Sequence, residues 1–72
     1  MNKNIRLSTG IGTRIKIERI RNNLSQVKLA EKSEVSISSY RRIEKGTVNS
    51  SADKIYRIIR ALRANCVEIF GF

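Results

Sequence analysis

The amino-acid sequence predicts a single all-α domain, folded as a compact bundle of five short helices. The chain has 72 residues, which leaves room for one small domain. Apolar residues make up 40% of it, enough for a packed core and too many for a disordered chain. Apolar residues recur with helical spacing, and no segment shows the sustained alternation of apolar and polar residues that is typical of a half-buried strand.

The first helix is predicted over residues 11–23, where Ile11 and Ile15 share one face. Residues 1–10 are polar and basic and contain no acidic residue. We therefore expect residues 1–10 to form a basic N-terminal arm that precedes the folded domain.

Two serines mark the starts of the next two helices. Ser25 is a candidate N-cap, because its hydroxyl can accept a hydrogen bond from a free N–H of the first turn. Ser36 follows after a short connection and begins a helix over residues 36–45. Gly46 is expected to end that helix, since glycine readily adopts the left-handed conformation found after helix C-termini.

The fourth helix has the clearest apolar stripe of the chain. Ser50 with Asp53, or Ser51 alone, can cap it. Its apolar face consists of Ile55, Ile58, Ile59 and Leu62. Asn65 is expected to cap a short fifth helix near the end of the chain.

The charge of the chain indicates a polyanionic partner. Fifteen Lys and Arg residues outnumber six Asp and Glu residues, for a formal net charge of +9. Nucleic acid and an anionic membrane surface are both candidates. A membrane-surface peptide would need one long basic amphipathic helix, and the serine caps interrupt any such helix, so we expect no membrane association. No apolar run is long enough to span a bilayer and no apolar signal region follows Met1, so a cytoplasmic location is expected.

Missing residue types exclude several kinds of chemistry. The chain has no histidine, and Cys66 is its single cysteine. A His/Cys metal site within one chain, an intrachain disulfide and acid–base catalysis by histidine are therefore excluded. With no nucleophile–base pair either, we expect no enzyme activity, no metal and no cofactor. Cys66 lies in an apolar stretch and is interpreted as a small buried hydrophobe.

The segment 25–46 contains the most informative pattern. Two short helices joined by a tight turn lie at a steep angle, so one can cross the phosphate backbone of DNA while the other enters the major groove. The pattern consists of Leu24-Ser25-Gln26, Leu29-Ala30, Val35-Ser36 and Ile43-Glu44-Lys45-Gly46, with Arg19 upstream. In this spacing the chain resembles the lambda repressor and Cro-like (xenobiotic-response-element-type) helix-turn-helix family. The resemblance extends over roughly residues 11–70, and it implies that residues 11–72 form a helix-turn-helix DNA-binding domain.

The resemblance also implies roles for individual residues. The positions that face base edges or flanking phosphates are Ile37, Ser38, Arg41 and Arg42. Arg42 is the best candidate base reader, because a guanidinium can form two hydrogen bonds with guanine. The positions expected to contact phosphates are Gln26, Lys28, Lys45, Thr47 and Asn49.

Other positions of the family pattern are structural. Arg19 and Glu44 match a family pair that forms an ion bridge behind the DNA-facing surface. Interior positions are occupied by Leu29, Ala30, Val35, Tyr40 and Ile43. The chain departs from the family at Glu34, where a turn glycine with positive φ is usual, and at Arg63, where glycine is frequent.

The implied function is a sequence-specific transcriptional regulator, a repressor that binds a palindromic operator as a homodimer through helix 36–45. The residues Val67, Ile69, Phe70 and Phe72 form a candidate dimer patch, although they could instead close the core of the monomer. The alternative is an antitoxin-type or other protein-interaction module that binds a protein partner such as a toxin or polymerase. Ile17 and Ile20, on the outer side of the first helix, are the feature that favours this alternative.

Overall fold

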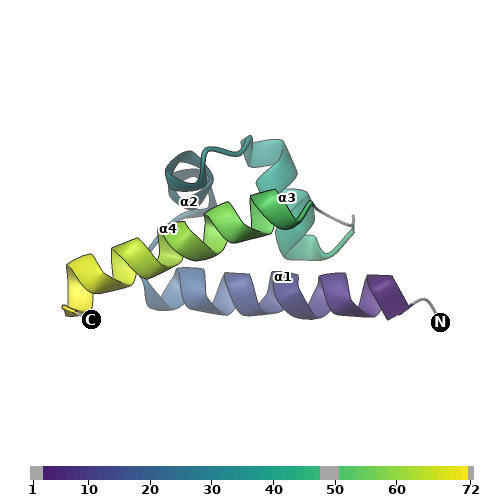
Figure 1. Ribbon diagram of the computed structural model, residues 1–72, viewed down its shortest axis with the longest axis horizontal. Coiled ribbons are helices and arrows are strands. Elements are labelled where there is room, and N and C mark those ends of the chain that lie inside the picture. The colour runs from purple at the N-terminus through teal and green to yellow at the C-terminus, as the bar shows by residue number, and fades with distance from the viewer. Residues whose placement is uncertain (1–2, 48–50, 72) are drawn as a thin grey trace.

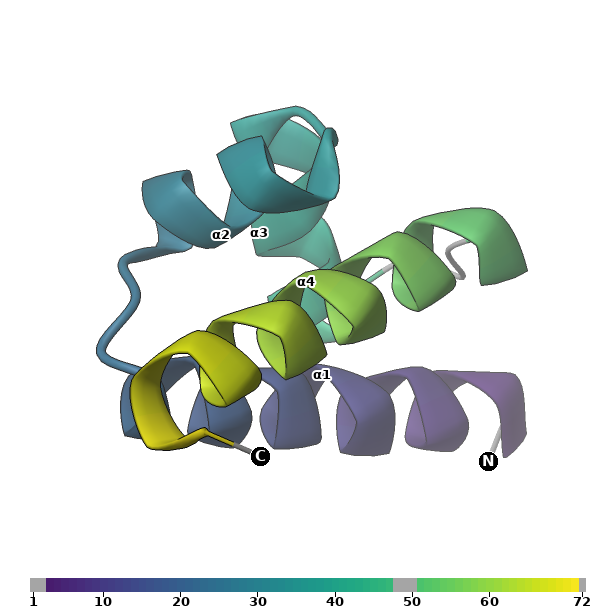
Figure 2. The same ribbon diagram turned by 60° about the vertical axis from the view of Figure 1, so that its left-hand side comes forward.

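The computed structural model describes residues 3–47 and 51–71, and these parts of the chain form four helices and no strand. The helices are α1 (Lys3–Arg21), α2 (Gln26–Ser33), α3 (Ile37–Lys45) and α4 (Ala52–Phe70). Helices α1 and α4 lie side by side and run in roughly the same direction, and α2 and α3 pack on one side of them (Figures 1 and 2). The all-α class is confirmed. None of these four helices is both long and apolar enough to cross a membrane.

The first helix is longer than the sequence predicted. It begins at Lys3 instead of Ile11, so most of the segment interpreted as an arm is helical. The physical reason is that residues 3–10 contain no proline, and the glycine at position 10 weakens a helix by only about 1 kcal/mol. A role of this segment in DNA binding stays a prediction.

The prediction of five helices is wrong, because α4 continues through the expected break at Asn65. Between Ala52 and Phe70 the chain contains neither glycine nor proline, and Arg63, a good helix former, occupies the position where the family often has glycine. The Asn65 side chain is buried and caps no helix. Its Nδ2 donates to the backbone oxygen of Asn22 at 3.3 Å and to the Asn22 side-chain oxygen at 3.1 Å.

The predicted serine caps are confirmed in the structure. The hydroxyl of each serine accepts a hydrogen bond from the backbone N–H three residues later, at 3.0 Å for Ser25, 3.1 Å for Ser36 and 3.3 Å for Ser51. Of the two caps considered for α4, Ser51 is the one observed, and Ser50 lies outside the described residues. Glu34 adopts a left-handed conformation with φ of 58°, as the position of a family glycine requires.

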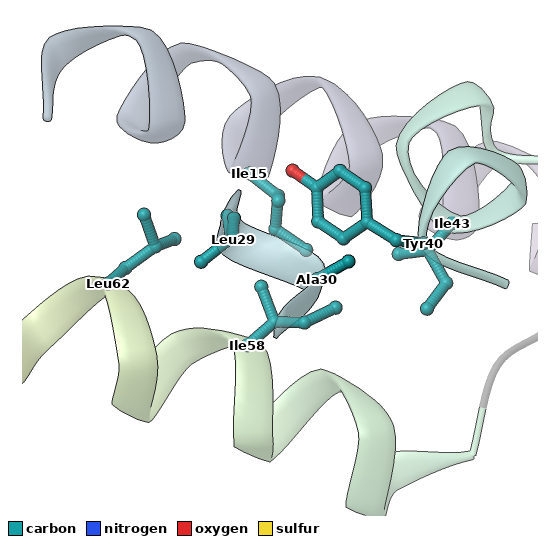
Figure 3. Close-up of a cluster of buried hydrophobic side chains, with 7 residues drawn as sticks. All are labelled: Ile15, Leu29, Ala30, Tyr40, Ile43, Ile58 and Leu62. Carbon is teal, nitrogen blue, oxygen red and sulfur yellow. The ribbon is translucent and has the colours of Figure 1, made fainter. Parts of the chain in front are cut away.

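One apolar core joins all four helices (Figure 3). Its buried members are Ile15 of α1, Leu29 and Ala30 of α2, Tyr40 and Ile43 of α3, and Ile58 and Leu62 of α4. Ala30 is only 2% exposed. Because α3 contributes two of these side chains, it is attached to the rest of the molecule by packing as well as by its short connections.

Gly12 lies where α1 meets the C-terminal end of α3. A Cβ atom at this position would lie 2.6 Å from the backbone oxygen of Glu44 and even closer to that of Ile43. Both obstacles are backbone atoms, so no side chain can move to make room. Gly12 therefore lets the backbone of α1 pack directly on the last carbonyl groups of α3.

We predict that Gly12→Ala destabilises the fold by about 1–3 kcal/mol, the usual cost of overpacking. This loss should appear although alanine is the better helix former by about 1 kcal/mol. The matched control is Gly10→Ala in the same helix, where an added Cβ meets nothing within 4 Å. Urea denaturation should show the control to be as stable as the original chain or more stable. Equal stability of the two variants would contradict the close contact with α3.

Candidate nucleic-acid interface

The solvent-facing side of α3 carries a cluster of polar and basic side chains. Ser38, Arg41, Arg42 and Lys45 are exposed, whereas Tyr40 and Ile43 on the opposite side are buried. None of the ion pairs found in residues 3–47 and 51–71 involves a cation of α3. These three positive charges are therefore available to an anion outside the protein.

The four candidate base-reading residues do not all lie on this exposed side. Ser38 and Arg42 are four residues apart and project from one face of α3, with Arg41 beside them. Ile37, in contrast, is half-buried, because part of its side chain packs against the core. It lies at the edge of the exposed face, where part of its side chain is still accessible.

The candidate phosphate-contacting residues fall into two groups. Lys45 and Thr47 are exposed at the C-terminal end of α3, where the Thr47 hydroxyl donates to the backbone oxygen of Arg42 at 3.4 Å. Asn49 lies outside the described residues. The other two candidates, Gln26 and Lys28, come from the first turn of α2.

The two α2 residues have different environments. Lys28 is exposed, and its Nζ lies 3.9 Å from a carboxylate oxygen of Glu31. Gln26 is half-buried, and its Nε2 donates to Oε1 of Glu44 at 3.1 Å. Gln26 thus connects the start of α2 to α3. A phosphate contact by Gln26 stays a prediction.

Directly behind the exposed face of α3, the carboxylate of Glu44 accepts four hydrogen bonds. Arg19 donates two of them, from Nε to Oε2 at 3.0 Å and from Nη2 to Oε1 at 3.3 Å. The hydroxyl of Tyr40 donates to Oε2 at 2.6 Å, and the amide of Gln26 donates to Oε1. Arg19 also donates from Nη1 to the backbone oxygen of Leu24 at 2.8 Å. One carboxylate therefore connects α1, α2 and α3, and we call these four side chains the Glu44 cluster.

The Glu44 cluster is largely shielded from water. The side chains of Arg19 and Glu44 are 12% and 5% exposed. Burial alone would raise the pKa of Glu44, but the hydrogen bonds from Arg19, Tyr40 and Gln26 and the charge of Arg19 outweigh it and hold this pKa below its usual value. The hydrogen bond to Glu44 raises the pKa of Arg19 despite its desolvation. Desolvation, followed by the hydrogen bond to Glu44, raises the pKa of Tyr40.

One member of this cluster, Tyr40, is not predicted from the sequence as a hydrogen-bond donor to Glu44. Tyr40 was assigned to the interior, which is correct for its ring, but its hydroxyl makes the shortest hydrogen bond to Glu44. The signal was present in the sequence. Tyr40 and Glu44 are four residues apart in a predicted helix, and residues at that spacing are neighbours on the helix surface.

The comparisons with known proteins agree with this geometry. A helix-turn-helix family model matches residues 15–69, which is most of the chain. The chain therefore belongs to the lambda repressor and Cro-like helix-turn-helix family, and it is a DNA-binding domain of the transcription-regulator kind. No curated protein and no solved structure matches it.

We predict strong coupling between Arg19 and Glu44. Removing either side chain leaves the other as a buried charge without its partner, which should cost about 3–5 kcal/mol of folding free energy. Removing both should cost clearly less than the sum of the two single losses. Chemical denaturation of Arg19→Ala, Glu44→Ala and the double variant measures the coupling. Additive losses would show that the two side chains act independently.

We also predict an acid-sensitive stability that depends on Glu44. Because its pKa is lower in the folded state than in the unfolded state, Glu44 stabilises the fold fully above the unfolded value of about 4.3. That contribution is lost as the pH falls through the lower folded-state pKa. Denaturation from neutral pH down to strongly acid pH should show Glu44→Gln approaching the original chain in stability as the pH falls. The control is Glu31→Gln, which removes an exposed carboxylate of α2 and should follow the original curve. A constant difference between Glu44→Gln and the original chain at all pH values would contradict the prediction.

Proposed function

We propose that this protein is a sequence-specific transcriptional repressor that binds a palindromic operator as a homodimer, with α3 in the major groove of DNA. The observation that carries the proposal is the two-sided character of α3. Its outer face presents Arg41, Arg42 and Lys45 outside all ion pairs of the described residues. Its inner face is fixed by Tyr40 and Glu44 through packing and the Glu44 cluster.

The placement of the individual side chains supports direct reading of bases. Arg42 is exposed in the middle of α3, and a guanidinium there can pair with the O6 and N7 atoms of guanine. Ser38, one turn earlier on the same face, can donate to or accept from several bases. Lys45 at the end of α3 is suited to a phosphate, because it presents a point charge without bidentate geometry.

The remaining charges favour DNA over a neutral partner. Four of the six acidic residues take part in ion pairs within the protein, and these are Glu18, Glu31, Glu44 and Asp53. The excess of Lys and Arg over acidic residues therefore produces a positive electrostatic field around the protein. Such a field accelerates encounter with DNA and makes binding dependent on salt.

Homodimer formation would provide two reading helices on one face of the duplex, about 34 Å apart. Val67, Ile69 and Phe70 are 52%, 48% and 50% exposed, so they do not close the core of the protomer. This exposure supports the interpretation of these residues as a dimer patch. Phe72, the fourth member, lies outside the described residues. A dimer bound across a promoter represses simply by excluding other proteins, and the proposed location of this activity is the cytoplasm.

A second candidate function is supported by the outer face of α1. Ile17 and Ile20 are 43% and 55% exposed. An antitoxin-type module would use such a surface to bind a protein partner, a toxin or a polymerase, with DNA binding as its secondary activity. Loss of partner binding in Ile17→Asp with DNA affinity retained would favour this candidate.

Selection of bound sequences from random double-stranded DNA tests the proposed function directly. The expected result is an enriched motif with two inverted half-sites about one helical turn apart. Absence of any enriched motif would contradict sequence-specific binding. An enriched motif without inverted symmetry would retain specific binding and contradict the symmetric dimer.

Once the operator has been selected, we predict that Arg42→Ala and Lys45→Ala change the affinity for DNA in different ways. Loss of a base contact should cost about 1–3 kcal/mol on the operator and little on random DNA. Loss of a phosphate contact should weaken both complexes alike and lower the salt slope by about 1. Affinities for both DNAs are measured at several salt concentrations. Arg60→Ala, which removes an exposed cation of α4, is the control and should leave the operator preference unchanged. Equal losses on both DNAs for Arg42→Ala would remove Arg42 from the base-reading residues.

A further inference from the structure

An apolar groove runs between α1 and α4. It has a volume of about 470 Å³, and its apolar lining consists of Ile11, Ile15, Ile59, Leu62 and Cys66. Ile11 and Ile59 are 42% and 49% exposed, so much of this lining is open to solvent. Its polar lining consists of Arg14, Glu18, Asn22 and Arg63, and Arg14 forms an ion pair with Glu18 at 3.5 Å.

The C-terminal end of α4 extends beyond the end of α1, the helix beside which it lies. The contact between Asn65 and Asn22 marks the level at which α1 has ended, since α1 stops at Arg21. Figure 1 shows the last turn of α4 reaching past that end along the long axis of the molecule. Ile69 follows Ile58, Leu62 and Asn65 at helical spacing, but it is 48% exposed whereas those three residues are buried. One chain therefore carries both an open apolar groove and a projecting apolar helix end.

We propose that the groove is filled by the α4 C-terminal end of a second copy of this chain, and that the two copies exchange this contact reciprocally. A two-fold interface uses the same surface on both partners. That surface must therefore contain both the groove and the helix end that fills it. Ile59, Leu62, Cys66 and Ile69 recur every three or four residues, so the groove and the helix end lie along one face of α4. The proposal rests on the homodimer of the proposed function and adds the surface through which it forms.

The distribution of charge favours this surface over others on the molecule. Two chains of net charge +9 repel each other wherever their basic residues meet. Residues 64–71 contain no Lys or Arg, and their single charged residue is Glu68. The C-terminal end of a helix is also the negative end of its dipole. Arg63 in the groove takes part in none of the ion pairs of the described residues, so it can receive that negative end.

The other exposed apolar surface is less suited to a second copy. Ile17 and Ile20 lie next to Lys16 and Arg21 in the sequence of α1, and both of these cations are exposed. Two copies that met there would bring four of these cations together. Ile17 therefore offers a matched control, because it is the same residue type as Ile59 with a similar exposed fraction, 43% against 49%.

Cys66 reports directly on whether the groove is covered. It is the single cysteine of the chain, it is half-buried, and it lines the groove. The experiment measures the rate of its alkylation by N-ethylmaleimide over a range of protein concentrations without DNA, alongside sedimentation equilibrium. If the second copy covers the groove, the rate follows the monomer fraction, and it falls twofold where half of the chains are dimeric.

Two variants complete the test. Ile59→Glu should be folded by circular dichroism, monomeric at concentrations where the original chain is dimeric, and alkylated at the monomer rate throughout. Ile17→Glu should dimerise and protect Cys66 as the original chain does. If Ile59→Glu does not fold, the concentration dependence of Cys66 alkylation in the original chain decides whether a second copy covers the groove.

The outcomes separate this inference from the proposed function. A dimer in which Cys66 is alkylated at a constant rate, or a dimer abolished by Ile17→Glu and retained by Ile59→Glu, overturns the groove interface and leaves the dimeric repressor intact. An original chain that stays monomeric both free and on the selected operator overturns the dimer itself, and the groove interface with it.

Discussion

The carboxylate of Glu44 accepts hydrogen bonds from Arg19 of α1, Gln26 of α2 and Tyr40 of α3. An apolar cluster of the same volume could hold these helices together equally well, because buried ion pairs contribute little net stability. Hydrogen bonds, however, act only over narrow ranges of distance and angle. The Glu44 cluster therefore fixes how α3 is rotated about its axis relative to α1 and α2. The direction in which Arg41 and Arg42 project depends on this rotation.

The axial position of α3 is determined by backbone contacts at its two ends. At the start, Ser36 caps the helix after a turn in which Glu34 is held in the left-handed conformation. At the end, Gly46 stops the helix, and Gly12 of α1 lies against the last carbonyl groups. Strain at Glu34 is tolerated because the surrounding contacts determine the turn. Rotation and axial position are thus fixed by separate groups of residues, and both are set before DNA is bound.

The sequence predicted those features that depend on local chemistry. Ser25, Ser36 and Gly46 act within one turn of their own positions, so α2 and α3 were placed correctly, and the helical period placed Ser38, Arg41 and Arg42 on one face. Asn65 was misassigned because asparagine can either cap a helix or donate from within one. A residue 43 positions away, Asn22, decides between the two. Whether Ile37 is exposed, and how open the α1–α4 groove is, also depend on packing between distant segments and cannot be read from local spacing.

The uninterrupted course of α4 accounts for both halves of the proposed dimer interface. A break at Asn65 would have allowed residues 66–70 to turn back toward α1 and cover the groove of their own chain. Because α4 continues, its last turn extends past the end of α1, and the groove between α1 and α4 stays open. The exposed helix end and the open groove therefore both result from the continuity of α4 through Asn65. In the proposed dimer, a second copy would supply by exchange the contact that a broken helix would have made within one chain, as in domain-swapped dimers.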